Sequence, residues 1–339
     1  MRSGQAIFQV LREISLGILP TMSRATTATR TQRERSSVRW GRNPLEVVVY
    51  AVTVPWLHLL ARAPLRFLYA VSDVVSFLLF RVLRVRRGVV LENLGGAFPE
   101  ASPEEIRRIA ARCYRNQCDV AAETLRMLVA RPEEICERVE MRVDIARRLQ
   151  EEGRSAIYVM GHNANWEWAI PATAAAIPKL TLHVVYHPLS HAGFDALLRR
   201  MRERFGAILS PMDEAPRAIV RLRRRVTAVI LVADQRPPSR SGWRTPFLHR
   251  ETGFLRGPER LARRLDMPVV FVEMIRLARG RYRLSAEWLC DDPASTTAGE
   301  ITERFARRLE RQIVAAPDDW LWLHRRWRDR RVERATRAR

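Results

Sequence analysis

The pattern of hydrophobic and polar positions changes character near residue 155. Beyond this point, short continuous apolar runs alternate with stretches whose apolar residues recur with helical periodicity. The runs at 156–160, 180–186, 226–233, 268–275 and 282–289 predict strands, and residues 166–176, 191–204, 257–265 and 299–314 predict helices. Continuous apolar strands that alternate with helices are typical of a mostly parallel sheet covered by helices. The predicted fold class is therefore α/β, with a mostly parallel central sheet.

Residues 44–80 are the most apolar stretch of the chain, and a different structure is predicted there. A helix that spans a bilayer needs about 20 consecutive apolar residues. This stretch is interrupted by charges and prolines at Glu46, Pro55, Arg62, Pro64, Arg66 and Asp73. Arginines flank it on both sides, so the positive-inside rule gives no orientation. Two shorter helices lying in one leaflet fit this pattern better than a single span, and a pair of buried core helices is the alternative.

The remaining pattern sets the domain boundaries. Residues 1–43 are rich in Arg, Ser and Thr and have little to bury, which indicates a disordered tail. The predicted organisation is a basic tail at 1–43, membrane-anchor helices at 44–87, an α/β domain at 88–330 and a second basic tail at 331–339. Within the α/β domain, Ser102 and Glu105 predict a capping box at the start of an amphipathic helix.

The charge balance restricts the partners of the protein. The 339-residue chain has a formal net charge of +22, and Lys179 is its only lysine. This balance favours an anionic partner, either nucleic acid, an anionic membrane or a phosphorylated substrate; genomic bias toward arginine is the alternative explanation. The four cysteines fit neither a zinc pattern nor a disulfide framework, which favours a reducing compartment. His183, His187 and His191 recur every four residues, but a predicted strand and Pro188 disrupt any helical metal face, so no metal site is predicted.

The stretch GHNANWEW, residues 161–168, places a histidine and an acid five residues apart, directly after the predicted strand 156–160. Ligands of α/β sheets bind beyond the carboxyl ends of the strands. A neutral imidazole at His162 can take a proton from a hydroxyl, and a carboxylate at Glu167 can orient the imidazole through its other ring nitrogen. No GxSxG elbow is present here, so the predicted nucleophile is a hydroxyl of the substrate. A surface histidine and a helix-start glutamate are the alternative explanation of this spacing.

Four further stretches accompany this one in order: VLENLGGAFPE (90–100), LVADQRPP (231–238), TGFLRGPERLARRLDMPVVFV (252–272) and PDDWLWLHRRWRDR (317–330). Together with GHNANWEW, they resemble the sequence blocks of the bacterial lipid A biosynthesis acyltransferases. These are the late, lauroyl/myristoyl-type enzymes of the lysophospholipid acyltransferase superfamily. The resemblance covers about residues 45–330. It implies a fold like that of the glycerolipid acyltransferases, acyl transfer from acyl carrier protein to a hydroxyl, and no metal or organic cofactor.

The resemblance also assigns roles to individual residues. It makes His162 the general base and Glu167 the acid that orients it. Substrate-binding positions fall on Asn165, Trp166, Asp234, Gln235 and Arg236, the last three standing where relatives hold a substrate phosphate or the oxyanion side of the site. The chain departs from the familiar pattern at Asn163-Ala164, where an aromatic or Thr and a Gly are frequent, and at the two prolines after Arg236. These departures leave the acceptor and the acyl chain length open.

Arginines crowd the segment between the predicted strands 226–233 and 268–275, at Arg236, Arg240, Arg244, Arg250 and Arg256. Guanidinium groups bind phosphate oxygens through directed N–H donors. A long loop inside a compact domain is more often functional than idle. We therefore expect a phosphate-binding loop that includes Arg236 and Arg256, with a merely solvated loop as the alternative.

Aromatic and basic residues also alternate near the carboxyl terminus, at Trp320, Trp322, Arg325, Arg326 and Trp327. Trp and Arg are both favourable at a membrane interface, and a basic face suits the acidic acyl carrier protein that the resemblance implies. Stacking of nucleic-acid bases on these side chains is the alternative. The apolar stretch 44–80 favours docking to a membrane or to acyl carrier protein.

The sequence therefore predicts an enzyme on the cytoplasmic side of the bacterial inner membrane. It moves a fatty acyl group from acyl carrier protein to a hydroxyl of a phosphorylated lipid A precursor or related glycolipid. A sibling enzyme that uses a lysophospholipid, glycerol-phosphate or amino-lipid acceptor is the first alternative. A basic nucleic-acid-binding protein is the second. Because that second alternative leaves residues 44–80 unexplained, no nucleic-acid partner is expected.

Overall fold

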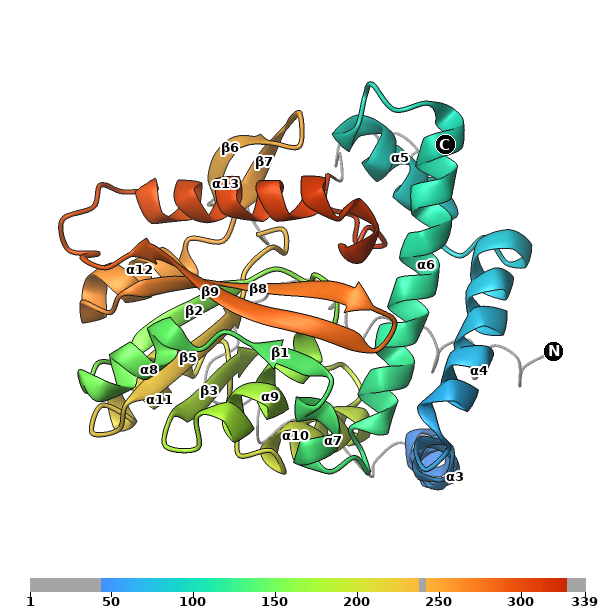
Figure 1. Ribbon diagram of the computed structural model, residues 1–339, viewed down its shortest axis with the longest axis horizontal. Helices are drawn as coiled ribbons and strands as arrows, with labels where there is room; N and C mark the ends of the chain where they lie inside the picture. Colours follow the sequence, from blue (N-terminus) through green and yellow to red (C-terminus); the bar gives the residue numbers. More distant parts are fainter. Residues whose placement is uncertain (1–43, 238–241, 328–339) are drawn as a thin grey trace.

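The computed structural model describes residues 44–237 and 242–327, so the predicted tails at 1–43 and 331–339 lie outside the described residues. Within this part of the chain, one sheet contains seven strands: β1 (Val139–Met141), β2 (Ala156–Met160), β3 (Thr181–Tyr186), β4 (Ile208–Pro211), β5 (Thr227–Val232), β8 (Val269–Ala278) and β9 (Arg281–Cys290). Their order across the sheet is β1-β9-β8-β2-β5-β3-β4 (Figure 1). Strand β9 is antiparallel to β8, and the other neighbouring pairs are parallel. The predicted α/β class with a mostly parallel sheet is confirmed.

Helices surround the sheet and extend from its edge. They are α3 (Pro44–Ala61), α4 (Leu65–Phe77), the π-helical turn η1 (Leu78–Val82), α5 (Arg87–Ala97), α6 (Pro103–Arg126), α7 (Pro132–Cys136), α8 (Asp144–Glu151), the 3-10 turn η2 (Trp166–Trp168), α9 (Ala169–Ala176), α10 (Ala192–Glu203), α11 (Ala215–Arg221), α12 (Gly257–Leu265), α13 (Glu300–Ala315) and the 3-10 turn η3 (Pro317–Asp319). The five predicted strands and four predicted helices are all present, with boundaries shifted by a few residues. At the start of α6, Ser102 Oγ accepts a hydrogen bond from the Glu105 backbone N–H at 3.2 Å, so the predicted cap is confirmed.

Two hydrophobic cores lie on opposite faces of the sheet. Along β2, Tyr158 and Met160 pack into one core, whereas Ile157 and Val159 pack into the other. All five residues of β2 are buried, which is the pattern of a central strand covered on both faces. The sheet is thereby fixed between two layers, and the loops at its carboxyl edge start from rigid positions.

Helices α3 and α4 carry an exposed apolar face. They are separate helices because Pro64 precedes α4 and disfavours helical backbone in the residue before it. Seven of their apolar side chains are at least half exposed: Val48, Val52, Trp56, Leu59, Phe67, Val74 and Phe77. The opposite side of α4 packs on the body of the protein through Leu65 and Leu68, and Figure 1 shows α4 running alongside α6. Within residues 44–237 and 242–327, none of the helices combines the length and the hydrophobicity that a membrane span requires.

The segment between β5 and α12 is not the continuous loop that the sequence suggested. It contains an antiparallel hairpin of β6 (Trp243–Phe247) and β7 (Arg250–Phe254). The alternating burial along both strands shows why the pattern was missed, because only Thr245, Phe247, Thr252 and Phe254 face inward. The hairpin packs against α13 and against the residues that follow it, 316–327, which we call the carboxyl-terminal segment (Figure 1).

Candidate active site

The carboxyl edge of the sheet brings two predicted site residues together. Strands β2 and β5 are parallel neighbours, with Met160 opposite Val232. His162 follows the first of these residues by two positions, and Asp234 follows the second by two positions. Equal spacing beyond paired strand ends places both side chains at the same point of the edge. Both are buried, with His162 7% exposed and Asp234 3% exposed.

Asp234 holds His162 by its ring and by its backbone. The Asp234 Oδ1 atom lies 2.5 Å from His162 Nδ1, and Oδ2 accepts from the His162 backbone N–H at 2.8 Å. Oδ2 also accepts from the indole Nε1–H of Trp320 at 2.8 Å. Burial alone would raise the pKa of Asp234, but the charge and hydrogen bonds of His162 outweigh it and lower that pKa well below its usual range. The carboxylate is therefore ionised and directs the Nε2 atom of His162 away from itself.

The turn that carries His162 is fixed by contacts from the carboxyl-terminal segment. Ala164 has a left-handed backbone, with φ of 49°, a conformation that L-residues seldom adopt. Its N–H donates to the Asp319 carbonyl at 2.9 Å, and Asn163 forms an isolated antiparallel bridge with Trp320. These contacts hold the turn in a strained shape, which is common at functional sites.

The predicted pairing of His162 with Glu167 is corrected by the structure. Glu167 lies in η2, after the left-handed turn, and it is 4% exposed. Both of its carboxylate oxygens bind Arg202 of α10, at 2.6 Å to Nη2 and 3.0 Å to Nε. The turn directs Glu167 toward α10, where this two-point contact occupies its oxygens. Asp234, which the sequence placed among the substrate-binding residues, occupies the orienting position instead.

Asn165 and Trp166 lie on the inner side of the same turn. Trp166 contacts the imidazole of His162 edge-on, with ring centroids 5.0 Å apart at 74°. Asn165 is fully buried, and its Oδ1 accepts from the Trp168 N–H at 3.2 Å, which caps η2. Its Nδ2 donates to Glu123 at 2.6 Å. Asn165 thus uses its amide to shape the turn, and Trp166 forms a wall beside the imidazole.

A buried polar network behind the turn was missed by the sequence analysis. Glu123 of α6 is 0% exposed and accepts three hydrogen bonds, from Tyr69 of α4 at 2.7 Å, Asn165 at 2.6 Å and Tyr282 of β9 at 2.7 Å. Burial raises the pKa of Glu123, although these hydrogen bonds oppose the rise. One helical turn earlier, Asp119 is equally buried. It binds Arg276, Arg279 and Ser72. The network connects the turn that carries His162 to α4, and its acids were indistinguishable in sequence from a solvated helix face.

Three of the predicted phosphate-binding arginines have different partners within the protein. Arg244 pairs with Glu251 across the β6–β7 hairpin. Arg250 donates to the Glu92 carbonyl at 2.8 Å, and Arg256 lies over the ring of Trp243, with its carbon Cζ 5.9 Å from the centroid. Arg240 lies outside the described residues.

Among the described arginines of this segment, Arg236 is the one that follows Asp234 at the carboxyl edge of the sheet. It follows Asp234 by two positions at the carboxyl edge and is partly exposed, as is Gln235 between them. The electrostatic influence of Arg236 reaches Arg326 in the carboxyl-terminal segment. The substrate-binding roles of Gln235, Arg236 and Arg256 stay predictions.

The carboxyl-terminal segment forms part of the site rather than an outer face. Trp320 is 3% exposed and Trp322 is 0% exposed, so the predicted membrane or carrier-protein contact is wrong for these two side chains. Trp320 supports Asp234, as described above. Burial and the charge of Arg326 lower the pKa of His324 to about 4. The imidazole of His324 is therefore neutral near pH 7, within electrostatic range of His162 and Asp234.

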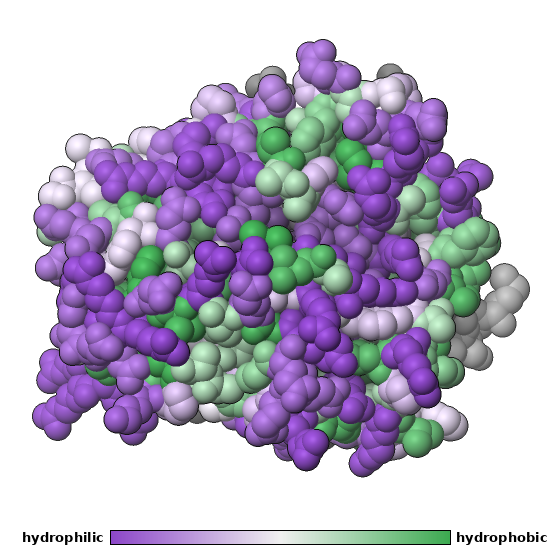
Figure 2. Space-filling view, viewed as in Figure 1, coloured by the Kyte–Doolittle hydropathy of each residue, from purple (hydrophilic) through white to green (hydrophobic). Residues whose placement is uncertain are grey.

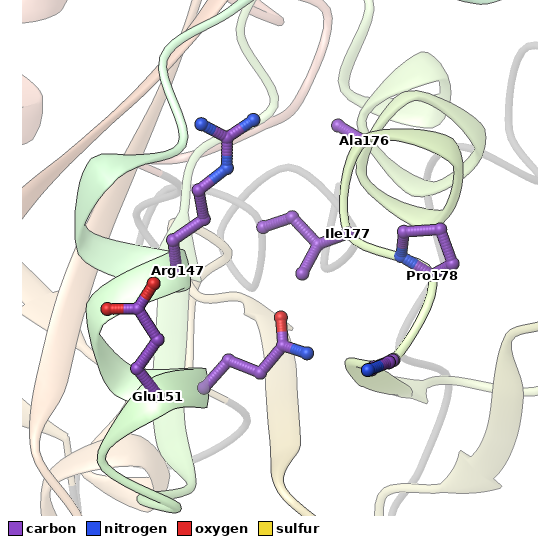
Figure 3. A pocket seen from close by; sticks show the side chains of 7 residues that line it. Arg147, Glu151, Ala176, Ile177 and Pro178 are labelled. Carbon is purple, nitrogen blue, oxygen red and sulfur yellow. The ribbon is translucent and has the colours of Figure 1, made fainter.

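A separate surface pocket lies away from this chemistry (Figure 3). It is formed where α8 and α9 end, before the chain enters β2 and β3, and thus at the amino edge of the sheet. Its lining residues are Arg147, Gln150, Glu151, Ala176, Ile177, Pro178 and Lys179. Within residues 44–237 and 242–327, no group of three or more His, Cys, Asp or Glu side chains is arranged to hold a metal ion.

The fold and the site define an α/β protein with a buried imidazole–carboxylate pair at the carboxyl edge of a mostly parallel sheet. The sequence profile of the bacterial lipid A biosynthesis acyltransferases matches residues 41–329, and the chain belongs to this family. The predicted family and the predicted enzyme class, an acyltransferase, are thereby confirmed. No individual curated protein matches the chain significantly.

Proposed function

We propose that this protein transfers a fatty acyl group from the thioester of acyl carrier protein to a hydroxyl of a phosphorylated lipid A precursor. The observation that carries the proposal is the His162–Asp234 pair at the carboxyl edge of the sheet. Membership of the family supports lipid A-like substrates. The carrier-protein donor and the membrane location rest on the charge and on the exposed surface.

The chemistry follows from the geometry of the pair. Asp234 occupies the Nδ1 side of His162, so the neutral imidazole can accept the hydroxyl proton of the acceptor at Nε2. The hydroxyl oxygen attacks the thioester carbonyl carbon, and a carbon–oxygen bond forms. Collapse of the tetrahedral intermediate breaks the carbon–sulfur bond, and the imidazolium returns its proton to the departing thiolate. Asp234 stabilises the imidazolium between these two proton transfers.

We propose that α3 and α4 hold the enzyme at the cytoplasmic face of the inner membrane. Seven of their apolar side chains are at least half exposed, and large exposed apolar patches are uncommon on proteins that meet only water. Figure 2 shows hydrophobic residues at the right-hand edge, where Figure 1 places α4, and further hydrophobic patches among the hydrophilic residues of the same face. Arg62, Arg66, Arg81 and Arg84 accompany this apolar face along the chain. Insertion of the apolar face beneath anionic headgroups, with arginines at headgroup level, fits this distribution.

The net charge of +22 favours an anionic donor such as the acidic carrier protein, because opposite charges accelerate and orient encounter. The same charge favours a phosphorylated acceptor. An enzyme that uses lysophospholipid, glycerol-phosphate or an amino-lipid would present the same His162–Asp234 pair, and it is therefore an outcome of the test below.

An assay with purified full-length protein in mixed micelles tests the proposed reaction. Acyl carrier protein that bears a radiolabelled fatty acyl group is offered with one acceptor in each reaction. The acceptors are a lipid A precursor, a lysophospholipid, glycerol-phosphate and an ornithine-type amino-lipid. We expect label to move to the lipid A precursor. Transfer to one of the other acceptors alone would replace the proposed substrate, and transfer from acyl-coenzyme A but not from the carrier protein would replace the proposed donor.

A flotation experiment tests the proposed membrane surface. We expect full-length protein to float with vesicles of phosphatidylglycerol and phosphatidylethanolamine. The variant Val52→Ser/Trp56→Ser/Phe67→Ser/Phe77→Ser should stay with the soluble fraction at moderate salt. The exposed residues Val220, Leu277 and Val314 lie on other elements, so their triple serine variant is a matched control. Equal flotation of both variants would remove α3 and α4 from the membrane contact.

A further inference from the structure

Two side chains stand out because each leaves two buried polar atoms without a partner. Among the described residues, these are Asn163, through Oδ1 and Nδ2, and Arg326, through Nε and Nη1. Both are 2% exposed. Buried polar groups are almost always hydrogen-bonded, because an unmade hydrogen bond destabilises the protein, and more so for a charged group. Asn163 follows His162 directly in the chain, and Arg326 lies within electrostatic range of Asp234, so both exceptions occur in the neighbourhood of the His162–Asp234 pair.

Arg326 is the more costly exception because it carries a charge. Its Nη2 donates to the Gly253 carbonyl at 2.6 Å, and its Cζ lies over the ring of Phe254, 4.8 Å from the centroid. Within the described residues, no carboxylate forms an ion pair with it. Its electrostatic environment includes Asp234, but both oxygens of that carboxylate already bind His162 and Trp320.

The charges around Arg326 favour an anion rather than a neutral group. Burial lowers the pKa of Arg326 to about 10, Asp234 opposes this decrease, and the positive charge of Arg236 adds to it. The guanidinium therefore stays charged near pH 7. Burial places it in a medium where a charge-assisted hydrogen bond is stronger than in water. A buried cation with two unused donor nitrogens and a second cation nearby matches the chemistry of phosphate.

We propose that Arg326 binds a phosphate ester of the substrate near the His162–Asp234 pair, through the N–H group of Nε or of Nη1. This inference rests on the proposed acyl transfer, because it assigns an atom group of those substrates to this residue. Neither nitrogen contacts solvent, so the phosphate enters only with a local displacement of the carboxyl-terminal segment or of the β6–β7 hairpin on which Arg326 rests. The phosphate belongs either to the acceptor lipid or to the phosphopantetheine arm of the donor, and the experiment distinguishes these sources.

The test compares substrates with and without phosphate in the wild type and in Arg326→Gln. One arm uses a phosphorylated and a dephosphorylated acceptor with the same donor. The other arm uses acyl carrier protein and the acyl thioester of N-acetylcysteamine, which has no phosphate, with the same acceptor. We expect Arg326→Gln to lower kcat/KM about tenfold to a hundredfold for the phosphate-bearing member of one arm, and to have little effect on its phosphate-free partner. Arg326→Lys should lose less, since it retains the charge.

Two controls separate this role from a structural one. Arg311→Gln removes the same charge from an exposed position on α13, where the side chain is 69% exposed, and it should behave as the wild type. Equal losses for both members of both arms in Arg326→Gln would overturn the proposal and leave Arg326 as a packing residue.

Binding of inorganic pyrophosphate gives a readout that does not need acyl transfer. We expect millimolar pyrophosphate to raise the Tm of the wild type and of Arg311→Gln by more than that of Arg326→Gln and Arg326→Lys. The same shift in all four proteins would overturn the site. A wild type that binds pyrophosphate through Arg326 but transfers no acyl group would refute the proposed reaction and leave the anion site standing.

Discussion

Two buried carboxylates flank the same turn, and they differ in their partners. Asp234 faces the imidazole of His162, whose second ring nitrogen is directed away from the carboxylate. Glu167 faces the guanidinium of Arg202, which contacts both carboxylate oxygens. An imidazole exchanges a proton near neutral pH, whereas a guanidinium does not. The first pair can therefore cycle through a charged and a neutral state, and the second is a permanent ion pair that fixes α10 against the turn.

This difference indicates that the His162 end and the Glu167 end of the turn have different functions. The His162–Asp234 pair performs the proton transfer in the mechanism proposed above. The Glu167–Arg202 pair contributes shape, and it is costly to break because the Glu167 side chain is 5% exposed and that of Arg202 only 15% exposed. The sequence suggested Glu167 as the acid that orients the histidine, whereas in the structure Asp234 holds the histidine and Glu167 binds Arg202.

The largest effect is expected on the His162–Asp234 side. His162→Ala should lower turnover by about a hundredfold or more, because the general base is removed. Asp234→Asn should cause a loss of similar or greater size, because an amide can present its N–H to Nδ1 and favours the wrong tautomer. Steady-state turnover at saturating substrates measures both, and circular dichroism confirms that the variants are folded. Near-normal turnover of folded His162→Ala would exclude the mechanism.

A double-mutant comparison sharpens the contrast between the two ends. The losses in His162→Ala and Asp234→Asn should be far from multiplicative in the double variant, because the pair acts as one unit. The losses in His162→Ala and Glu167→Gln should be closer to multiplicative, because the two residues share no contact in the structure. Non-multiplicative losses in the second cycle, as large as those in the first, would restore the partnership that the sequence suggested.

Substitution of Glu167 should lower the free energy of unfolding more clearly than it lowers turnover. Glu167→Gln leaves the guanidinium of Arg202 buried without its counter-charge, and breaking a buried ion pair from one side costs about 3–5 kcal/mol. Chemical denaturation should therefore show a lower free energy of unfolding. Replacing both partners, as in Glu167→Gln/Arg202→Met, should recover part of it. A stable Glu167→Gln protein with a large loss of turnover would instead indicate a direct catalytic role for Glu167.

Part of the fold and of the candidate site could be predicted from the sequence, and the other part could not, for physical reasons. Continuous apolar runs marked β2 and β5, so the strand ends that carry His162 and Asp234 were predictable. Their adjacency was not, because β2 pairs with β5 only through the order of the whole sheet. The position of Glu167 depended on the left-handed backbone of Ala164, a residue whose type does not predict that conformation. The hairpin β6–β7 was missed because charged residues alternate with its inward side chains.

The ionisation of Asp319 should have a smaller effect, a pH-dependent contribution to the free energy of unfolding. Burial raises the pKa of Asp319 to about 6, and the charge of Arg276 opposes this. The folded protein therefore binds a proton more tightly than the unfolded chain. This contribution favours the folded state at low pH and is lost as the pH rises from about 4 to 6. Asp319→Asn keeps the acceptor for Asn116 and removes the titration. Its free energy of unfolding relative to the wild type should rise by roughly 2 kcal/mol between pH 4 and pH 7, and a constant difference would contradict the raised pKa.

The smallest expected effect on turnover concerns Glu123, which supports the turn through Asn165. Glu123 and Asp119 lie one helical turn apart on α6 and are both 0% exposed, but only Glu123 contacts the turn, through Asn165. The carboxylate fixes the Asn165 amide with its nitrogen inward, so that its oxygen caps η2. Glu123→Gln permits the opposite orientation and loosens that cap, so we expect roughly a tenfold fall in kcat with little change in KM.

Asp119→Asn is the matched control for this last effect. It disturbs an equally buried carboxylate, and its partners Arg276, Arg279 and Ser72 do not touch the turn. It should lower the Tm at least as much as Glu123→Gln does, because it weakens two buried ion pairs, while kcat of the folded protein changes less. If Asp119→Asn and Glu123→Gln have the same Tm and show the same fall in kcat, the network acts as a single structural unit. Glu123 then has no separate influence on the turn that carries His162.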